Sequence, residues 1–189
     1  MTILAKEEHA LREEMVRIAA SFFQRGYATG SAGNLSLLLP DGNILATPTG
    51  SCLGNLDPQR LSKVDPQGEW LNGDKPSKEV RFHLALYRNN PCCKAVVHLH
   101  STWSTALSCL EGLDPQNVIR PFTPYVVMRM GDIPLVPYYR PGMTELLAIW
   151  LRWRPGIRPF YWLIMGRSCA GRICRKPLII PRSWKRRQS

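Results

Sequence analysis

Two histidines separated by one residue, His98 and His100, directly follow the apolar run 95–97. Side chains along an extended strand alternate between its two faces, so both imidazoles are expected to project from the same face. Neutral imidazole is a favoured ligand for Zn²⁺ and related transition metals. The pattern therefore predicts half of a metal site at the end of a strand. The alternative is two histidines packed in the protein interior.

Three segments earlier in the chain carry residue types that could serve the same chemistry. Residues 30–34 (GSAGN) could turn backbone N–H groups toward an anion, and residues 47–51 (TPTGS) offer hydroxyls beside a flexible turn. In the third segment, PSKE, Glu79 is an acid at the expected start of a helix. Each segment by itself could be an ordinary turn or a capped helix. Glu79 also forms a rival metal pair with His83, although His83 is better interpreted as a core or supporting histidine.

The surrounding sequence alternates between helical and strand patterns, as in an α/β domain. A helix with one apolar face is expected over about residues 6–24, and residues 40–43 (PDGN) predict a hairpin. Residues 56–73 have the composition of a loop. The other expected elements are strands over 35–39, 44–47, 95–100, 126–129 and 133–137, a helix over 78–88 capped by Ser77, and a helix opened by Ser101 or Thr102.

Length and composition limit the class of protein. A chain of 189 residues predicts one domain. It holds no uncharged apolar run of about 18 residues, so no membrane span is expected. The first residues are charged and helix-like, unlike a signal peptide. The six cysteines lack a C-x-x-C pair or a framework spacing, which predicts reduced thiols in a cytoplasmic protein.

The net charge of +11 is concentrated at one end of the chain. Residues 1–142 hold 14 Lys and Arg against 13 Asp and Glu, whereas residues 143–189 hold 11 against one acid and carry four of the six tryptophans. A basic, aromatic segment could bind nucleic acid. However, this tail has no hydrophobic period and four prolines interrupt it. No nucleic-acid partner is expected, and the change of composition itself needs an explanation.

The four motifs occur in a fixed order: G-N-L-S (33–36), P-T-G (48–50), P-S-K-E (76–79) and H-L-H-S (98–101). In this order the chain resembles the class II aldolase/adducin family over nearly all of residues 8–142. Its nearest branch is that of the sugar-acid enzymes, the 3-oxo-tetronate 4-phosphate decarboxylases. The resemblance implies a single three-layer α/β/α domain with a central, mainly antiparallel sheet, and a homotetramer.

The resemblance also implies roles for individual residues. His98 and His100 would hold a divalent metal, usually Zn²⁺. Glu79 would accept a proton and could be a ligand of the resting metal. Tyr138, which ends the segment I-P-L-V-P-Y, would donate a proton near a subunit interface.

The family's substrate-binding positions also have counterparts in this chain. The residues that would bind the substrate phosphate are Gly33, Asn34, Thr49, Gly50 and Ser77. Lys78 stands where aldolases of the family tend to have a second serine. A cation at this position would suit a substrate that carries a carboxylate as well as a phosphate.

The implied reaction is the cleavage of a carbon–carbon bond beside a carbonyl group. Such cleavage leaves an electron pair that must rest on oxygen as an enediolate, which a Lewis-acidic metal stabilises. A neighbouring carboxylate can then move a proton. The resemblance favours decarboxylation of a 3-oxo-tetronate 4-phosphate. Aldol cleavage or epimerisation of a ketose phosphate, an adducin-like scaffold without catalysis, and a nucleic-acid-binding protein remain as alternatives.

The tail departs from the family, which has a third histidine ligand in an A-N-H-G segment. No histidine follows His100. If residues 161–166 are encoded as TAC TGG CTA ATC ATG GGC, regrouping each third base with the next two gives Leu-Ala-Asn-His-Gly. We therefore interpret residues 143–189 as the frame-shifted remainder of the same domain, with the break at about Gly142. Such a chain is expected to retain metal weakly, to be poorly soluble and to leave a sheet edge unpaired.

Overall fold

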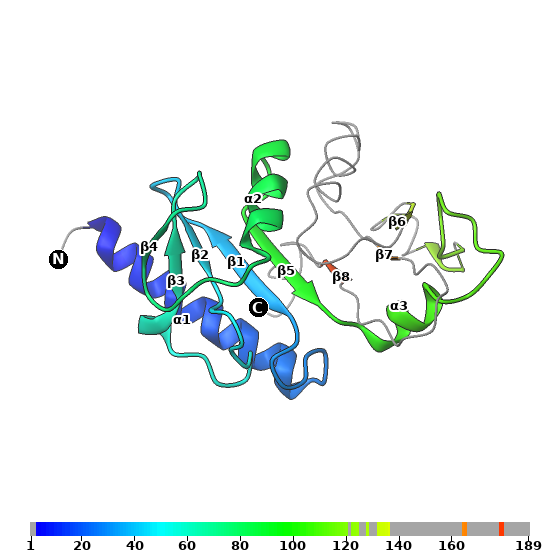
Figure 1. The fold of residues 1–189 in the computed structure, drawn as a ribbon, viewed down its shortest axis with the longest axis horizontal. Coiled ribbons are helices and arrows are strands. Elements are labelled where there is room, and N and C mark those ends of the chain that lie inside the picture. Colours follow the sequence, from blue (N-terminus) through cyan, green and yellow to red (C-terminus); the bar gives the residue numbers. More distant parts are fainter. Residues whose placement is uncertain are drawn as a thin grey trace.

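The computed structural model describes residues 3–120, 122–124, 128, 132–136, 164–165 and 178–179 (Figure 1). The elements in chain order are α1 (Ile3–Gln24), β1 (Asn34–Leu38), β2 (Ile44–Ala46), the 3₁₀ turn η1 (Pro58–Arg60), β3 (Ser62–Val64), β4 (Trp70–Asn72), α2 (Val80–Asn89), β5 (Ala95–Leu99), α3 (Thr102–Leu107), β6 (Leu135–Val136), β7 (Ile164–Met165) and β8 (Leu178–Ile179). Within this part of the chain, no helix combines the length and the apolar character needed to cross a membrane.

Six strands form one sheet in the order β4-β3-β2-β1-β5-β8, and every neighbouring pair is antiparallel. The hairpin expected at residues 40–43 joins β1 to β2, with Leu38 opposite Ile44. Gly42 has a φ of +85°, which glycine adopts without steric cost. The short strands β6 and β7 form a separate parallel pair. The expected α/β class with a central, mainly antiparallel sheet is confirmed.

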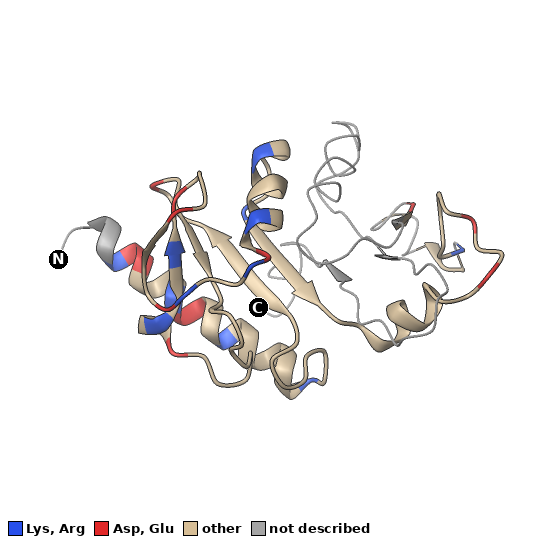
Figure 2. Ribbon diagram, in the orientation of Figure 1, with Lys and Arg blue, Asp and Glu red and all other residues tan. Residues whose placement is uncertain are grey.

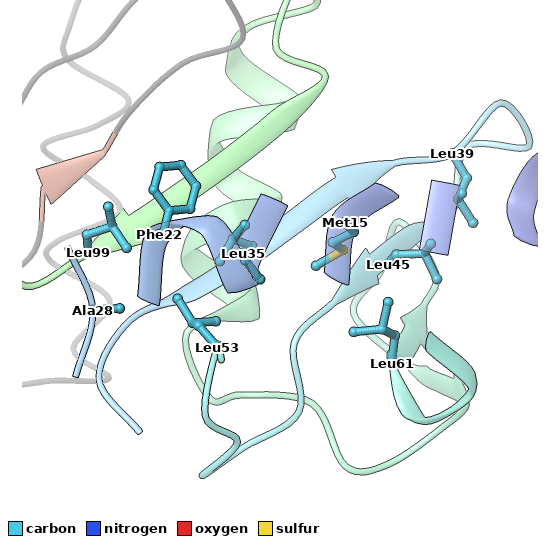
Figure 3. Close-up of a cluster of buried hydrophobic side chains, with 10 residues drawn as sticks. Met15, Phe22, Ala28, Leu35, Leu39, Leu45, Leu53, Leu61 and Leu99 are labelled. Atoms are coloured by element: carbon cyan, nitrogen blue, oxygen red, sulfur yellow. The ribbon is translucent and has the colours of Figure 1, made fainter. Parts of the chain in front are cut away.

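Helices α1 and α2 cover opposite faces of this sheet. Leu45 of β2 belongs to the buried cluster beneath α1, whereas its neighbours Ile44 and Ala46 belong to the cluster beneath α2. This alternation is what the two-residue period of a strand requires when both faces are covered. Figure 3 shows the first cluster between α1 and the strands. The result is the predicted arrangement of helix, sheet and helix.

The same alternation decides which face of β5 carries the histidines. Val97 and Leu99 pack with the cluster beneath α1. His98 lies between them in sequence, so its side chain projects from the opposite face, toward α2. The functional candidates are therefore on the α2 side of the sheet.

Several sequence expectations are corrected by the fold. The segment 56–73, expected to be rich in loops, also contains β3 and β4, because strands of three residues are too short to show a periodic pattern. Helix α2 begins at Val80 rather than at residue 78. The hydroxyl of Ser77 accepts a hydrogen bond from the Glu79 backbone N–H (3.3 Å), so it stabilises the turn before the helix. The cap expected at Ser101 is confirmed by its bond from the Ser104 N–H.

Among the described strands β5 is not at an edge of the sheet, which ends at β4 and β8, and the expected unpaired edge stays a prediction. β8, from the tail, pairs antiparallel with β5 and places Ile179 opposite His98. The strand expected over 133–137 is shorter and spans Leu135–Val136. Most of the strand expected over 126–129, Tyr138 and nearly all of the tail lie outside the described residues.

A charged cluster fastens α1 to the far strands of the sheet. The Lys63 ammonium on β3 donates hydrogen bonds to Glu8 (2.7 Å) and Asp41 (3.0 Å). The buried Arg12 guanidinium donates to Glu8 and to the Leu61 carbonyl. Partial burial would raise the pKa of Glu8 and of Asp41, but the bonds from their cationic partners leave both below their usual values. Figure 2 shows charged positions of both signs on α1 and basic ones on β3.

We expect Lys63→Met to lower the free energy of unfolding by roughly 1–2 kcal/mol at neutral pH, between the values typical of exposed and of buried ion pairs. The depressed pKa values of Glu8 and Asp41 mean that their contribution is present above about pH 4 and is lost as the pH falls through the folded-state values. The pKa of Lys63 is raised from 10.5, so its contribution is complete below that pH. Urea unfolding of both proteins, from neutral pH down to about pH 2, should show the difference shrinking in acid. A difference independent of pH would contradict this account.

Candidate metal and substrate site

The site is assembled where β1 begins beside β5. Asn34, the first residue of β1, pairs with His98 in the antiparallel register. Gly33 precedes it with a φ of +86°. Glu79 comes to the same place from the turn before α2, where its carboxylate remains partly exposed. Strand pairing and helix packing thus bring together residues that are 45 and 64 positions apart in the chain.

The Glu79 carboxylate holds one nitrogen of His98. Its Oε2 lies 2.6 Å from His98 Nδ1 and accepts a 2.5 Å hydrogen bond from the Asn34 amide. Partial burial would raise the pKa of Glu79, but the bonds from His98 and Asn34 outweigh it and lower the pKa to about 2. A carboxylate that is ionised at neutral pH cannot donate, so the proton in the short contact belongs to Nδ1.

This protonation places the lone pair of His98 on Nε2. The side chain is 2% exposed, and no partner for Nε2 occurs among the described residues. The ring of His100 lies beside it, with the two centroids 5.1 Å apart. A histidine whose Nδ1–H is held by a carboxylate and whose Nε2 is buried with a free lone pair has the usual arrangement of a metal ligand. These residues therefore fit a divalent metal.

The described residues do not complete such a site by themselves. Within them, no group of three His, Cys, Asp or Glu side chains is arranged to hold a metal ion. The carboxylate of Glu79 is directed to Nδ1 of His98, where it orients the ring. The third histidine ligand stays an expectation from the family resemblance.

His83 does not form the rival metal pair with Glu79. Its Nδ1 lies 2.7 Å from the Ser36 hydroxyl, while Glu79 is directed to His98. Complete burial, reinforced by the neighbouring His98, lowers the pKa of His83 to about 3. The ring is therefore neutral at physiological pH and takes the supporting place that the sequence favoured.

The segments expected to bind the phosphate lie next to one another. Thr47 accepts a hydrogen bond from the Leu35 N–H through its hydroxyl, and Pro48 pairs with Pro76 in an isolated antiparallel bridge. The Thr49 N–H donates to the Lys75 carbonyl. These links join the start of β1, the turn 47–51 and the turn before α2. Within them, Thr49, Gly50 and Lys78 are exposed and Ser77 is half-buried.

Gly33→Ala is expected to destabilise the protein and displace His98. A Cβ at Gly33 would lie 2.8 Å from the His98 carbonyl oxygen, and a positive φ is itself unfavourable for alanine. Gly30→Ala is the matched control, because Gly30 also has a positive φ but nothing within 4 Å of the added Cβ. Urea unfolding should give a loss of about 1–3 kcal/mol from strain at either position and a larger loss at Gly33. Equal losses would contradict the close contact.

The sequence patterns assign no role to two residues of this region. Ser36 lies in the motif G-N-L-S, and Tyr87 lies in the helix expected over residues 78–88. Ser36 follows Asn34 by two positions on the same strand face, and Tyr87 follows His83 by one helical turn. That spacing was the available signal.

Comparisons with known proteins agree with the motif order. Residues 13–163 match the family described as Class II Aldolase and Adducin N-terminal domain. A 3-oxo-tetronate 4-phosphate decarboxylase of Escherichia coli O6:H1 is 87% identical over 142 residues, which are 75% of this chain and 67% of the relative. A protein of the same name from Cupriavidus necator is 53% identical over 141 residues, 75% of this chain and 64% of the relative.

Solved structures share the fold. The crystal structure of YgbL from Escherichia coli has a TM-score of 0.81 at 68% identity and covers 92% of this chain and 79% of its own. An L-fuculose 1-phosphate aldolase has a TM-score of 0.69 at 19% identity, covering 90% of this chain and 74% of its own, which shows the common fold alone.

The matched stretch spans about two thirds of the length of these decarboxylases. The predicted resemblance, including its sugar-acid branch, is confirmed by relatives that are named as lyases of this kind. The chain belongs to the class II aldolase and adducin N-terminal domain family.

Proposed function

We propose that this chain carries the metal- and substrate-binding part of a decarboxylase acting on a 3-oxo-tetronate 4-phosphate. The observation that carries the proposal is the Glu79–His98 pair. It holds Nδ1 at 2.6 Å and leaves the buried Nε2 available beside His100. The names of the 53–87% identical relatives supply the substrate class.

The residues of the site match the steps of such a reaction. When bound, a divalent cation supplies Lewis-acid stabilisation of negative charge on the substrate oxygens. Loss of carbon dioxide leaves the electron pair of the broken bond as an enolate, and a proton must then reach carbon. Glu79 is ionised in the absence of substrate, so it has no proton to donate. It can donate one only after it has accepted one from the substrate. Tyr138 is the proposed proton donor for the final step.

The exposed turns supply the substrate contacts. We assign the phosphate to the N–H groups and hydroxyls of the segments containing Gly33, Thr49 and Ser77, which hydrogen bonds and a strand bridge hold together. Lys78 is exposed beside Ser77 and is assigned to the substrate carboxylate. Its ammonium would attract an anion more strongly than the serine found in aldolases of the family.

Three finer assignments belong to the same proposal. Zn²⁺ is the proposed metal, because imidazole nitrogens are among its usual ligands. A homotetramer is supported by large apolar side chains exposed on and after α3, which include Trp103 (85%) and Phe122 (83%). The cytoplasm is the proposed location, in agreement with reduced cysteines.

We also propose that residues 143–189 are the frame-shifted remainder of the domain. The aligned stretch of 142 residues has the length of the segment before the predicted break. The comparison with YgbL covers 92% of the chain, and its sequence identity is 68%. The length of the aligned stretch and this lower identity over a longer one both support a tail whose sequence departs from the family. The consequence is an impaired metal site, because the third histidine is missing.

The activity is tested with the chain as it stands and with a version whose frame is restored after Gly142. Carbon dioxide release from 3-oxo-tetronate 4-phosphate and cleavage of L-fuculose 1-phosphate are measured with and without a chelator. We expect chelator-sensitive decarboxylation by the restored protein and little by the chain as it stands. Cleavage of the fuculose phosphate without decarboxylation would make the protein an aldolase. Activity that resists chelation and metal depletion would remove the metal from the proposal.

Lys78→Ser in the restored protein is expected to raise KM for the 3-oxo acid by about tenfold, the effect of losing one charged contact of roughly 1.5 kcal/mol. The affinity for a phosphorylated ketose without a carboxylate should stay unchanged. Lys75→Ser, an exposed lysine three residues earlier, is the matched control. Steady-state kinetics on both substrates measures the effect. An equal change for both substrates would assign Lys78 to the phosphate instead.

A further inference from the structure

One face of α2 carries polar side chains at every fourth position, which is unusual for a helix face packed against a sheet. Glu79, just before the helix, is followed by His83 and Tyr87. Residues four apart lie on one helical face. The strand opposite carries Asn34 and Ser36, which are two residues apart and so share one strand face. The polar face formed by Glu79, His83 and Tyr87 thus lies opposite Asn34 and Ser36 of β1.

Hydrogen bonds join these polar side chains across the two faces. The Asn34 amide donates to Glu79 (2.5 Å), Ser36 Oγ lies 2.7 Å from His83 Nδ1, and the same hydroxyl lies 2.8 Å from the Tyr87 hydroxyl. His83 is 1% and Ser36 2% exposed. We call Ser36, His83 and Tyr87 the α2 ladder.

The ladder lies directly behind the histidine of the candidate metal site. The rings of His83 and His98 have centroids 6.4 Å apart, and Phe82 contacts both edge-to-face. Burying a polar group costs free energy unless the group is hydrogen-bonded. An apolar side chain would therefore be expected at a position whose role is only to stabilise the fold. The polar contacts therefore point to a requirement for a fixed geometry.

The start of α2 explains why that geometry needs support. Among the described contacts, Glu79 makes no side-chain capping bond to the helix. Its carbonyl is the acceptor for the His83 N–H (3.2 Å), in the first turn. The ends of helices fray when their terminal groups are not fixed. Anchoring His83 to β1 one turn later fixes the backbone that carries Glu79.

We propose that the α2 ladder is a positioning device that sets the register of α2 along β1 and so holds the Glu79 carboxylate on Nδ1 of His98. The inference concerns how the ring is oriented, and for its consequence in metal binding it rests on the proposed function. Ser36, His83 and Tyr87 act through Glu79. A network that contributes to folding stability alone is the competing explanation.

The test compares His83→Leu, which removes the contact with Ser36, with His83→Asn, whose amide can take the place of Nδ1. Tyr87→Phe removes only the hydroxyl that contacts Ser36. Leu61→Val, in the other buried cluster, serves as a control that perturbs the core without touching the ladder. The first readout is the ring-nitrogen NMR spectrum of His98 in the metal-free chain, which reports the tautomer. The second is Zn²⁺ affinity by competition with a chelating dye.

In the unsubstituted protein we expect His98 to be protonated on Nδ1. His83→Leu should give a mixture of tautomers and weaken Zn²⁺ binding by about tenfold or more, as for other groups that orient a metal-ligating histidine. Tyr87→Phe should have a smaller effect in the same direction, His83→Asn should restore most of both signals, and Leu61→Val should change neither. An unchanged His98 tautomer in His83→Leu would overturn the inference. Absence of Zn²⁺ binding by both the unsubstituted and the frame-restored chain would overturn the proposed function, and the tautomer would still decide the positioning role.

Discussion

Restoring the reading frame after Gly142 is expected to raise the Zn²⁺ affinity of the chain by at least about 100-fold. Loss of a group that merely orients a ligating histidine costs 10–100-fold in affinity, so loss of a ligand itself must cost at least as much. In the chain as it stands, His98 and His100 are the histidines on the metal-binding face, and no histidine follows them. Competition with a chelating dye, and metal content after dialysis, measure the gain.

The controls separate the third ligand from a general repair of folding. His98→Ala in the restored chain should return the affinity to the weak level, because it removes the ligand whose Nε2 is directed away from Glu79. His9→Ala, an exposed histidine on α1, should leave it unchanged. Sequencing of the DNA over codons 140–166 tests the break directly. A continuous frame in independent isolates, or equal Zn²⁺ affinity before and after restoration, would contradict the frame shift.

Glu79→Gln in the restored chain is expected to lower kcat by about 10²–10⁴, the usual contribution of a positioned acid or base. The amide has nearly the same shape, and its oxygen can still accept the Nδ1–H of His98. Metal affinity should therefore fall by no more than about tenfold, while proton transfer is lost. Steady-state kinetics and Zn²⁺ titration on the same preparation separate these effects.

Two outcomes would change the role of Glu79. A loss of Zn²⁺ affinity as large as that in His98→Ala would make the carboxylate a metal ligand in the working enzyme. An unchanged kcat would exclude it from proton transfer. Glu7→Gln, at an exposed position of α1, is the matched control for removing one negative charge and should have no effect on either quantity.

The environment of Glu79 bears on both of its proposed roles, orienting His98 and transferring a proton. Its pKa of about 2 is set by His98 and Asn34, which hold it as a carboxylate in the absence of substrate. In the proposed reaction, a carboxylate with so low a pKa is a weak base, so Glu79 would have to leave Nδ1 of His98 before it accepts a proton from the substrate. The proposed role of the α2 ladder is to fix the backbone beneath the carboxylate during this movement.

Much of this protein could be inferred from local sequence patterns. Short apolar runs in β2 and β5 predicted strands, and the turn at residues 40–43 predicted the hairpin that the fold contains. The order of four short motifs identified the family, which the family match confirms. The histidine pair was recognisable since a spacing of two puts both rings on one strand face.

Local patterns in the chain were enough to predict the family, the fold class and the residue types suited to chemistry, whereas folding selects which of these residues meet. β3 and β4 are too short to show a period, so only their pairing, β3 with β2 and β4 with β3, defines them. The choice of His98 rather than His83 as the partner of Glu79 depends on the register between α2 and β1. That register is set by contacts between residues 45 to 51 positions apart, and no local pattern encodes the distance between two side chains that only folding brings together.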